Sequence, residues 1–153
     1  MDTSVFKAYD IRGKYPEEIN ENMAYKIGKS YGSYLKLFLD KNKCVVGRDN
    51  RLSSLSLVSA LKKGLIDSGI NVIDYGEITT PMHYYSRYLN HTYGIMVTAS
   101  HNPKDDNGFK FSFVELANAR GSMTEEFKDH TFLESQLLNP TPWPHRTTWL
   151  RSD

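Results

Sequence analysis

The stretch that decides the fold reads Gly94-Ile95-Met96-Val97-Thr98-Ala99-Ser100-His101-Asn102-Pro103, continued by Lys104-Asp105-Asp106-Asn107-Gly108-Phe109-Lys110. Its apolar first part is typical of a buried strand, and the polar residues after it are typical of a turn. Asn107-Gly108 predicts a second turn before a last strand over residues 109–113. That strand is expected to run antiparallel to the first, with its three phenylalanines on one face and Lys110 on the other.

Strands and helices alternate upstream of this stretch. Strand-like segments cover residues 5–13, 43–47, 70–76 and 94–98. Helical spacing predicts helices over residues 20–39 and 55–68, and Thr80-Pro81 predicts a short third helix capped by Thr80. This order predicts an α/β protein with three α/β/α layers. Its sheet is expected to be mixed and mainly parallel, with about four to five strands and the last strand antiparallel.

Three smaller patterns predict packing. Ala24, Gly28 and Gly32 form a row of small residues that is expected to bring the first helix close to the sheet. His83 and His91 have no partner at metal-ligand spacing, so we expect them on the surface or in helix packing. The tyrosines of residues 84–93 are also expected to pack, because too few basic residues interleave with them for a base-stacking platform.

Composition places the chain among globular proteins. It has 153 residues, 39% hydrophobic and 24% charged, with a formal net charge of +1. This balance favours no bulk attraction to nucleic acid or to an anionic membrane. No apolar run approaches the roughly 20 residues of a spanning helix, and the first residues do not resemble a secretory signal. The single cysteine, Cys44, is compatible with the reducing cytoplasm, where we expect the protein to reside.

The chain is expected to divide near residue 138. Ser122 and Glu125 form a capping-box pattern that predicts a final helix over residues 123–138. Residues 1–138 are therefore expected to form one domain. Residues 139–153, rich in proline and tryptophan, are expected to be a tail or a linker.

Polar residues follow several of the predicted strands. Arg12, Arg48 and Ser100 are each expected just past a strand end. Ligands of parallel sheets gather at the carboxyl ends of the strands, so the topology predicts that these side chains converge at one edge.

Ser100 has two interpretations. A serine at a strand end commonly caps backbone groups. His101, Asn102 and Lys110 instead offer the donors that a phosphoserine, with about −1.5 to −2 charges, requires. A hydrolase pair of Ser100 with His101 is disfavoured, since adjacent side chains diverge and no Gly-x-Ser-x-Gly elbow is present.

The arginines after the second strand are equally open. Arg48 and Arg51, like Arg12, can bind phosphate or position the serine loop. They can also simply solvate the surface, or pair with Asp10 and Asp49.

Three segments together resemble one known family. Thr98-Ala99-Ser100-His101-Asn102-Pro103 with Asn107-Gly108-Phe109-Lys110 resembles the phosphoserine loop of the α-D-phosphohexomutases, the phosphoglucomutase/phosphomannomutase superfamily. Ala8-Tyr9-Asp10-Ile11-Arg12-Gly13 resembles the N-terminal motif of that superfamily. Val46-Gly47-Arg48-Asp49-Asn50-Arg51-Leu52-Ser53 resembles its second-strand motif. The three motifs lie in the family's order within about the first 115 residues, which identifies the chain as similar to the N-terminal domain I.

The resemblance implies a carrier serine and its helpers. Ser100 would exchange a phosphoryl group with a hexose phosphate, interconverting 1-phosphate and 6-phosphate through a bisphosphate, and its phosphate would bind Mg²⁺. His101 and Lys110 would assist catalysis, with Tyr9, Arg12, Asn102, Arg48 and Arg51 as substrate or phosphate-binding residues. Glucose 1,6-bisphosphate or a similar activator would load the serine.

The resemblance covers only part of such an enzyme. The family's Asp-x-Asp-x-Asp metal loop, sugar-selecting loop and C-terminal phosphate-binding domain are not found in this sequence, and Asp106 replaces a common aromatic residue. The chain is therefore expected to need the remaining mutase domains as partners and to turn over little alone. A noncatalytic module that binds a sugar phosphate or a protein is the alternative. A flavodoxin-like phosphate-binding domain would explain the alternation of strands and helices, but not the serine turn.

Overall fold

A computed structural model describes residues 3–7 and 10–112 and contains one five-stranded sheet in the order β1-β5-β4-β2-β3. Strand β2 is parallel to both of its neighbours, and β5 is antiparallel to both of its own. The expected mixed, mainly parallel sheet is thus confirmed. The elements are η1 (Thr3–Val5), β1 (Asp10–Lys14), α1 (Glu21–Phe38), β2 (Lys43–Arg48), α2 (Ser54–Asp67), β3 (Asn71–Glu77), α3 (Thr80–Asn90), β4 (Tyr93–Val97) and β5 (Asp106–Phe111).

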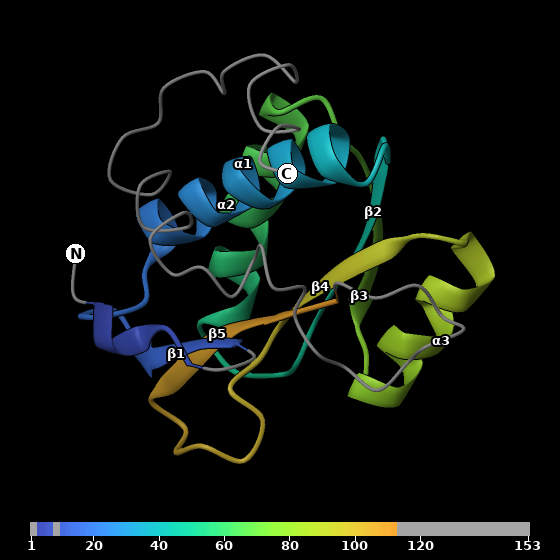
Figure 1. Ribbon diagram of the computed structural model, residues 1–153. Helices are drawn as coiled ribbons and strands as arrows, with labels where there is room; N and C mark the ends of the chain where they lie inside the picture. Colours follow the sequence, from blue (N-terminus) through green and yellow to red (C-terminus); the bar gives the residue numbers. More distant parts are fainter. Residues whose placement is uncertain (1–2, 8–9, 113–153) are drawn as a thin grey trace.

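The helices form layers on the two faces of the sheet. Figure 1 shows α1 and α2 together on one side and α3 on the other. The main core lies under α1 and α2, where apolar side chains such as Ile27, Leu61, Ile95 and Phe109 are completely buried. Burying side chains of this size contributes about 1.5–3 kcal/mol each. This core holds in place the strands that carry the polar loops.

The first strand begins later than expected. Residues 3–5 form a 3₁₀ turn, and Phe6 makes only an isolated bridge to Ile11. The Lys7 N–H donates to the Asp10 carbonyl at 2.8 Å, so the chain turns before β1 begins. Val5 reaches the core from this turn, with 2% of its surface exposed. Its apolar character reflects burial and not strand pairing.

Two local predictions were also wrong. Asn107 and Gly108 lie inside β5, where Asn107 is fully buried and Gly108 pairs with Arg12 of β1. A Cβ at Gly108 would lie 2.1 Å from the Ile11 carbonyl oxygen, so glycine serves close strand contact here. The cap of α3 is Thr79 and not Thr80, because the Thr79 side chain accepts from the Met82 N–H.

The row of small residues on α1 faces α2 and not the sheet. A Cβ at Gly28 would lie 2.3 Å from the Leu61 carbonyl oxygen. A Cβ at Gly64 of α2 would lie 2.1 Å from the Tyr25 carbonyl oxygen. The two backbones touch where these glycines meet, which accounts for the presence of glycine in two helix interiors.

Helix α3 has a buried polar face and an exposed apolar one. His83 is 2% exposed and packs over the strand glycines Gly47 and Gly94. The prediction that the tyrosines pack is confirmed for Tyr93 of β4, which is buried, but it is wrong for those of α3. The outward residues of that helix are exposed: Met82, Tyr84, Tyr85, Tyr88 and Leu89. Only Arg87 is charged on this helix, and it is buried. His91 takes the left-handed conformation at the end of α3.

Buried His83 predicts a pH-dependent stability. Burial, followed by the charges of Arg87 and Lys110, lowers the pKa of His83 to about 3. The unfolded chain binds a proton below pH about 6.5 and the folded chain does not, so folding stability falls as the pH drops below 6.5. We expect a loss of about 2 kcal/mol near pH 5 from this residue. Urea unfolding of wild type and His83→Gln at several pH values measures it, and parallel pH profiles would contradict the expectation.

The predicted helix over residues 123–138, the division near residue 138 and Phe113 lie outside the described residues. No helix in the described part of the chain is long and apolar enough to cross a membrane.

Candidate functional site

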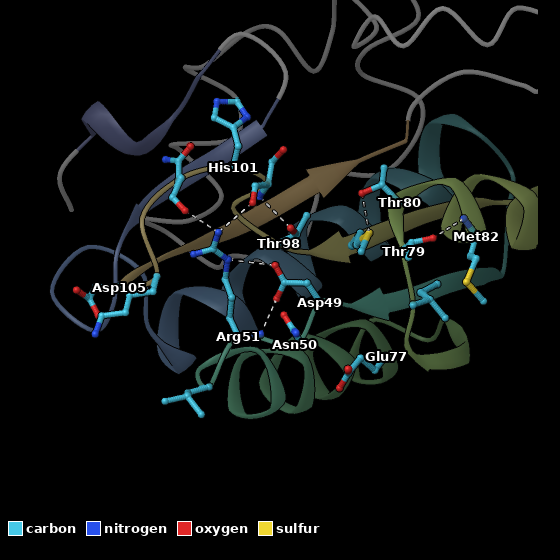
Figure 2. A pocket seen from close by; sticks show the side chains of 16 residues that line it. Asp49, Asn50, Arg51, Glu77, Thr79, Thr80, Met82, Thr98, His101 and Asp105 are labelled. Carbon is cyan, nitrogen blue, oxygen red and sulfur yellow. Dashed lines mark hydrogen bonds and ion pairs between the residues drawn. The ribbon is translucent and has the colours of Figure 1, made fainter.

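A hollow opens at the carboxyl edge of β2, β3 and β4. Its volume is about 1040 Å³. Three segments line it: residues 49–52 after β2, residues 77–80 at the end of β3 and the start of α3, and the serine loop, defined as residues 99–105. Figure 2 shows side chains from all three segments around this hollow. The topology gathers the loops after β2 and β4 at one edge, as the sequence predicts. Of the three side chains expected to converge there, Ser100 lines the hollow, whereas Arg12 and Arg48 do not.

Ser100 is held in an uncommon backbone conformation at this edge. Its φ is 57°, in the left-handed region that residues other than glycine rarely adopt. Its N–H donates to the Thr98 hydroxyl at 2.9 Å, and the neighbouring Ala99 is fully buried. Ser100 itself is exposed and lines the hollow. A strained, anchored backbone that presents one hydroxyl to solvent is common at functional sites.

Arg51 donates hydrogen bonds to the backbone of the serine loop. Its Nη2 donates to the carbonyl oxygens of Ser100 and Asn102, at 3.0 and 2.8 Å. Its Nη1 donates to the carbonyl oxygens of Pro103 and Asp106. Its Nε pairs with the Asp49 carboxylate at 3.2 Å. Figure 2 shows Arg51 lying between Asp49 and the loop.

Arg12 of β1 supports the same loop through Asn102, a residue of the loop itself. Arg12 lies inside β1 and not past its end, opposite Gly108. Its Nη1 donates to Asn102 Oδ1 at 3.1 Å and to the Ala99 carbonyl at 3.4 Å, while its Nη2 pairs with Asp10. The Asn102 Nδ2 donates in turn to the Asp106 carboxylate at 3.0 Å. The polar atoms of Asn102 are therefore occupied within the loop region.

The other predicted residues differ in their position relative to the hollow. Arg48 and Lys110 are not among the described residues that line the hollow. Arg48 donates to Glu77 at 3.0 Å and to the Asp49 carbonyl at 3.1 Å. The Lys110 ammonium lies 5.9 Å from the centre of the Tyr84 ring, on the α3 face of the sheet. His101 lines the hollow beside Ser100, and Tyr9 lies outside the described residues.

Several residues at the site escaped the sequence reasoning. Lys104 lines the hollow together with Ser100 and His101. Its position in the same loop as Ser100 could have predicted this. Buried Asn107 donates to the Ser53 and Ser54 hydroxyls, at 2.8 and 2.9 Å. Ser54 donates onward to Asp49. The sequence motifs contain Asp49, Ser53 and Asn107. No pattern indicates that they are joined, because they become neighbours only when β5 meets the start of α2.

Replacing Asn107 with leucine is expected to destabilise the fold by about 2 kcal/mol. The change leaves the Gly108 N–H, which donates to Asn107 Oδ1 at 2.8 Å, and two serine hydroxyls without their partner. Urea unfolding measures the effect, with Asn71→Leu at an exposed position of β3 as control. An Asn107→Leu chain as stable as the control chain would contradict this role.

The described residues bring no group of three or more histidine, cysteine, aspartate or glutamate side chains together that could hold a metal ion. Asp49 at the hollow already accepts from Arg51 and Ser54. These residues alone therefore do not provide a set of ligands for Mg²⁺.

Fold and site together define a class: an α/β domain that presents one strained serine on a braced loop at the carboxyl edge of its sheet. Residues 3–137 match the model of the phosphoglucomutase/phosphomannomutase alpha/beta/alpha domain I. The chain belongs to this family and corresponds to its domain I.

Relatives agree with this assignment. The chain is 53% identical over 107 residues to a phosphomannomutase of Vibrio cholerae, and the match covers 69% of the chain and 23% of that enzyme. The chain thus spans about a quarter of the length of this relative. A crystal structure of a phosphoglucomutase/phosphomannomutase family protein from Burkholderia thailandensis has a TM-score of 0.75 and 33% identity over 90% of this chain and 30% of that one. A putative phosphomannomutase from Thermus thermophilus gives a TM-score of 0.71 and 28% identity over 86% of this chain and 29% of that one.

Proposed function

We propose that this chain is the phosphoryl-carrying domain of a phosphohexomutase and that Ser100 is the carrier. The observation that supports this most is the backbone of Ser100: a left-handed, anchored serine that faces an open hollow. A serine that served only to form a turn would not require the hydrogen bonds by which Arg51 and Arg12 hold its loop in place. The cytoplasmic location expected from the sequence stays a prediction.

The proposed reaction has two transfers. The Oγ–P bond of phosphorylated Ser100 breaks as a hydroxyl oxygen of the hexose phosphate bonds to phosphorus; that hydroxyl gives up its proton, and the Ser100 Oγ takes one up. The bisphosphate then reorients in the site. The Ser100 Oγ gives up its proton as it attacks the other phosphoryl group, the P–O bond to the sugar breaks, and the sugar oxygen takes up a proton. Such transfers depend mainly on positioning and on stabilising the charge of the phosphate oxygens.

His101 and Lys110 are the proposed catalytic helpers. His101 lines the hollow and is proposed to move the proton. Lys110 is proposed to neutralise phosphate charge, for which its ammonium must leave the Tyr84 ring. Arg48 and Tyr9 stay proposed substrate contacts. For Arg12 and Asn102 the hydrogen bonds favour support of the loop.

Mg²⁺ would bind this chain at the phosphate of Ser100 and, when bound, would offset the negative charge of that phosphate. Its remaining ligands and the sugar contacts are proposed to belong to the other mutase domains. Glucose 1,6-bisphosphate is the proposed activator that loads the serine.

A chimera tests the function. Residues 1–112 replace the matching segment of the Vibrio cholerae phosphomannomutase, and the interconversion of mannose 1-phosphate and mannose 6-phosphate is measured. We expect activity within about tenfold of the parent enzyme, and little turnover from the 153-residue chain alone. A folded chimera that binds hexose phosphate without converting it would favour a noncatalytic module instead.

A further inference from the structure

We propose that Arg51 is a positioning residue that holds Ser100 in its left-handed conformation by binding the backbone of the serine loop. This inference rests on the proposed function and assigns to Arg51 a role in catalysis without contact to the substrate. The sequence left two roles open for this residue, phosphate binding and positioning of the serine loop, and the hydrogen bonds favour the second.

The contacts of Arg51 reach both ends of the loop. Nη2 binds the carbonyls of Ser100 and Asn102 at 3.0 and 2.8 Å, and Nη1 binds that of Asp106 at 2.9 Å and that of Pro103. Carbonyl oxygens that converge on one point repel each other, and a cation among them removes that repulsion. The planar guanidinium can serve several acceptors at fixed angles, which the ammonium of a lysine cannot do.

Arg51 is itself held in place by the start of α2. The Asp49 carboxylate accepts from the Arg51 backbone N–H at 3.1 Å and from its Nε at 3.2 Å. Ser54 donates to Asp49, and Asn107 of β5 donates to Ser54. Only 12% of the Arg51 side chain is exposed. A continuous set of hydrogen bonds therefore joins the scaffold to the carbonyl of Ser100.

The orientation of Arg51 disfavours direct phosphate binding. Each of its three guanidinium nitrogens already donates to a protein oxygen. Releasing the Ser100 carbonyl would free the φ angle of Ser100, and the backbone would relax toward a commoner conformation. The position of the hydroxyl relative to the hollow that Ser100 lines would then change.

Hydrogen exchange of the 153-residue chain tests the proposal without requiring phosphoryl transfer. The reporters are the loop amides of Asn102 and Asp106, which donate to the carbonyls of Ala99 and Pro103. In Arg51→Lys we expect these amides to exchange at least about tenfold faster, with the amides of β2 and β4 unchanged. Lys62→Ala, which removes a surface ion pair with Asp74, serves as control.

Two exchange results would overturn the proposal. One is loop exchange in Arg51→Lys that equals wild type. The other is an equal acceleration in loop and strands, because Arg51 would then support the whole fold and not the loop.

In the chimera, the rate at which Ser100 accepts a phosphoryl group from glucose 1,6-bisphosphate separates positioning from binding. We expect Arg51→Lys to lower the maximal rate about tenfold and to leave the half-saturating donor concentration within about twofold. A raised half-saturating concentration with an unchanged maximal rate would assign Arg51 to phosphate binding and overturn the proposal. A chimera with Arg51 that accepts no phosphoryl group would count against the proposed function, and the exchange result would then decide the role of Arg51.

Discussion

Ser100→Ala in the chimera is expected to lower mutase turnover by about three orders of magnitude or more. The alanine has no oxygen to form the bond to phosphorus, so both transfers of the proposed cycle stop. The variant is expected to fold, because the Ser100 side chain is exposed and its N–H, which bonds Thr98, is kept. The rate of conversion of mannose 1-phosphate, measured with enough enzyme to exceed the background rate, gives the size of the loss.

Ser59→Ala is the matched control for this variant. Ser59 is an exposed serine on α2, and its hydroxyl bonds only the Leu55 carbonyl of its own helix among the hydrogen bonds described. Its activity is expected to stay at the wild-type level. Normal turnover by Ser100→Ala would remove Ser100 from the role of carrier.

Gly64→Ala is expected to destabilise the chain by about 2–3 kcal/mol. The added methyl group would lie 2.1 Å from the Tyr25 carbonyl oxygen and 2.9 Å from the Lys29 nitrogen, both backbone atoms of α1. In an isolated helix, alanine is more favourable than glycine by about 1 kcal/mol. The cost of moving α1 and α2 apart to admit the methyl group is larger than this gain, so the net effect is destabilising. Urea unfolding measures the difference.

Ser59→Ala again provides the comparison, since it places alanine on the outer face of the same helix. Its effect is expected to stay within about 0.5 kcal/mol. A Gly64→Ala chain as stable as wild type would mean that α1 and α2 do not meet through their backbones.

The spacing of apolar residues in the sequence was sufficient to predict most of the fold. The apolar spacing of α1 and α2 and the short run of β4 reflect burial, and burial is what a sequence pattern records. The same reasoning failed at Val5 and at the Asn107-Gly108 pair. Val5 is buried from a turn, and Asn107 is satisfied by serines of a distant segment, so in both cases a tertiary contact overrides the local preference.

The site was predictable in composition but not in its hydrogen bonds. The polar residues after β2 and β4 do lie near each other because parallel strands end at one edge. The partners of Arg51 are backbone carbonyls, which carry no side-chain signature in the sequence. The position of Lys110 over the Tyr84 ring could not be inferred from its nearness to Ser100 along the chain, because α3, which carries Tyr84, packs there only in the folded domain.

The position of the phosphoryl group during turnover tests the central claim most directly. The chimera is mixed with radiolabelled glucose 1,6-bisphosphate and mannose 1-phosphate, quenched during turnover, digested and mapped by mass spectrometry. Ser100 as carrier predicts the label on the hydroxyl of Ser100 in the wild-type chimera and no labelled peptide in Ser100→Ala. Label on another residue, or full turnover without any labelled protein, would contradict it.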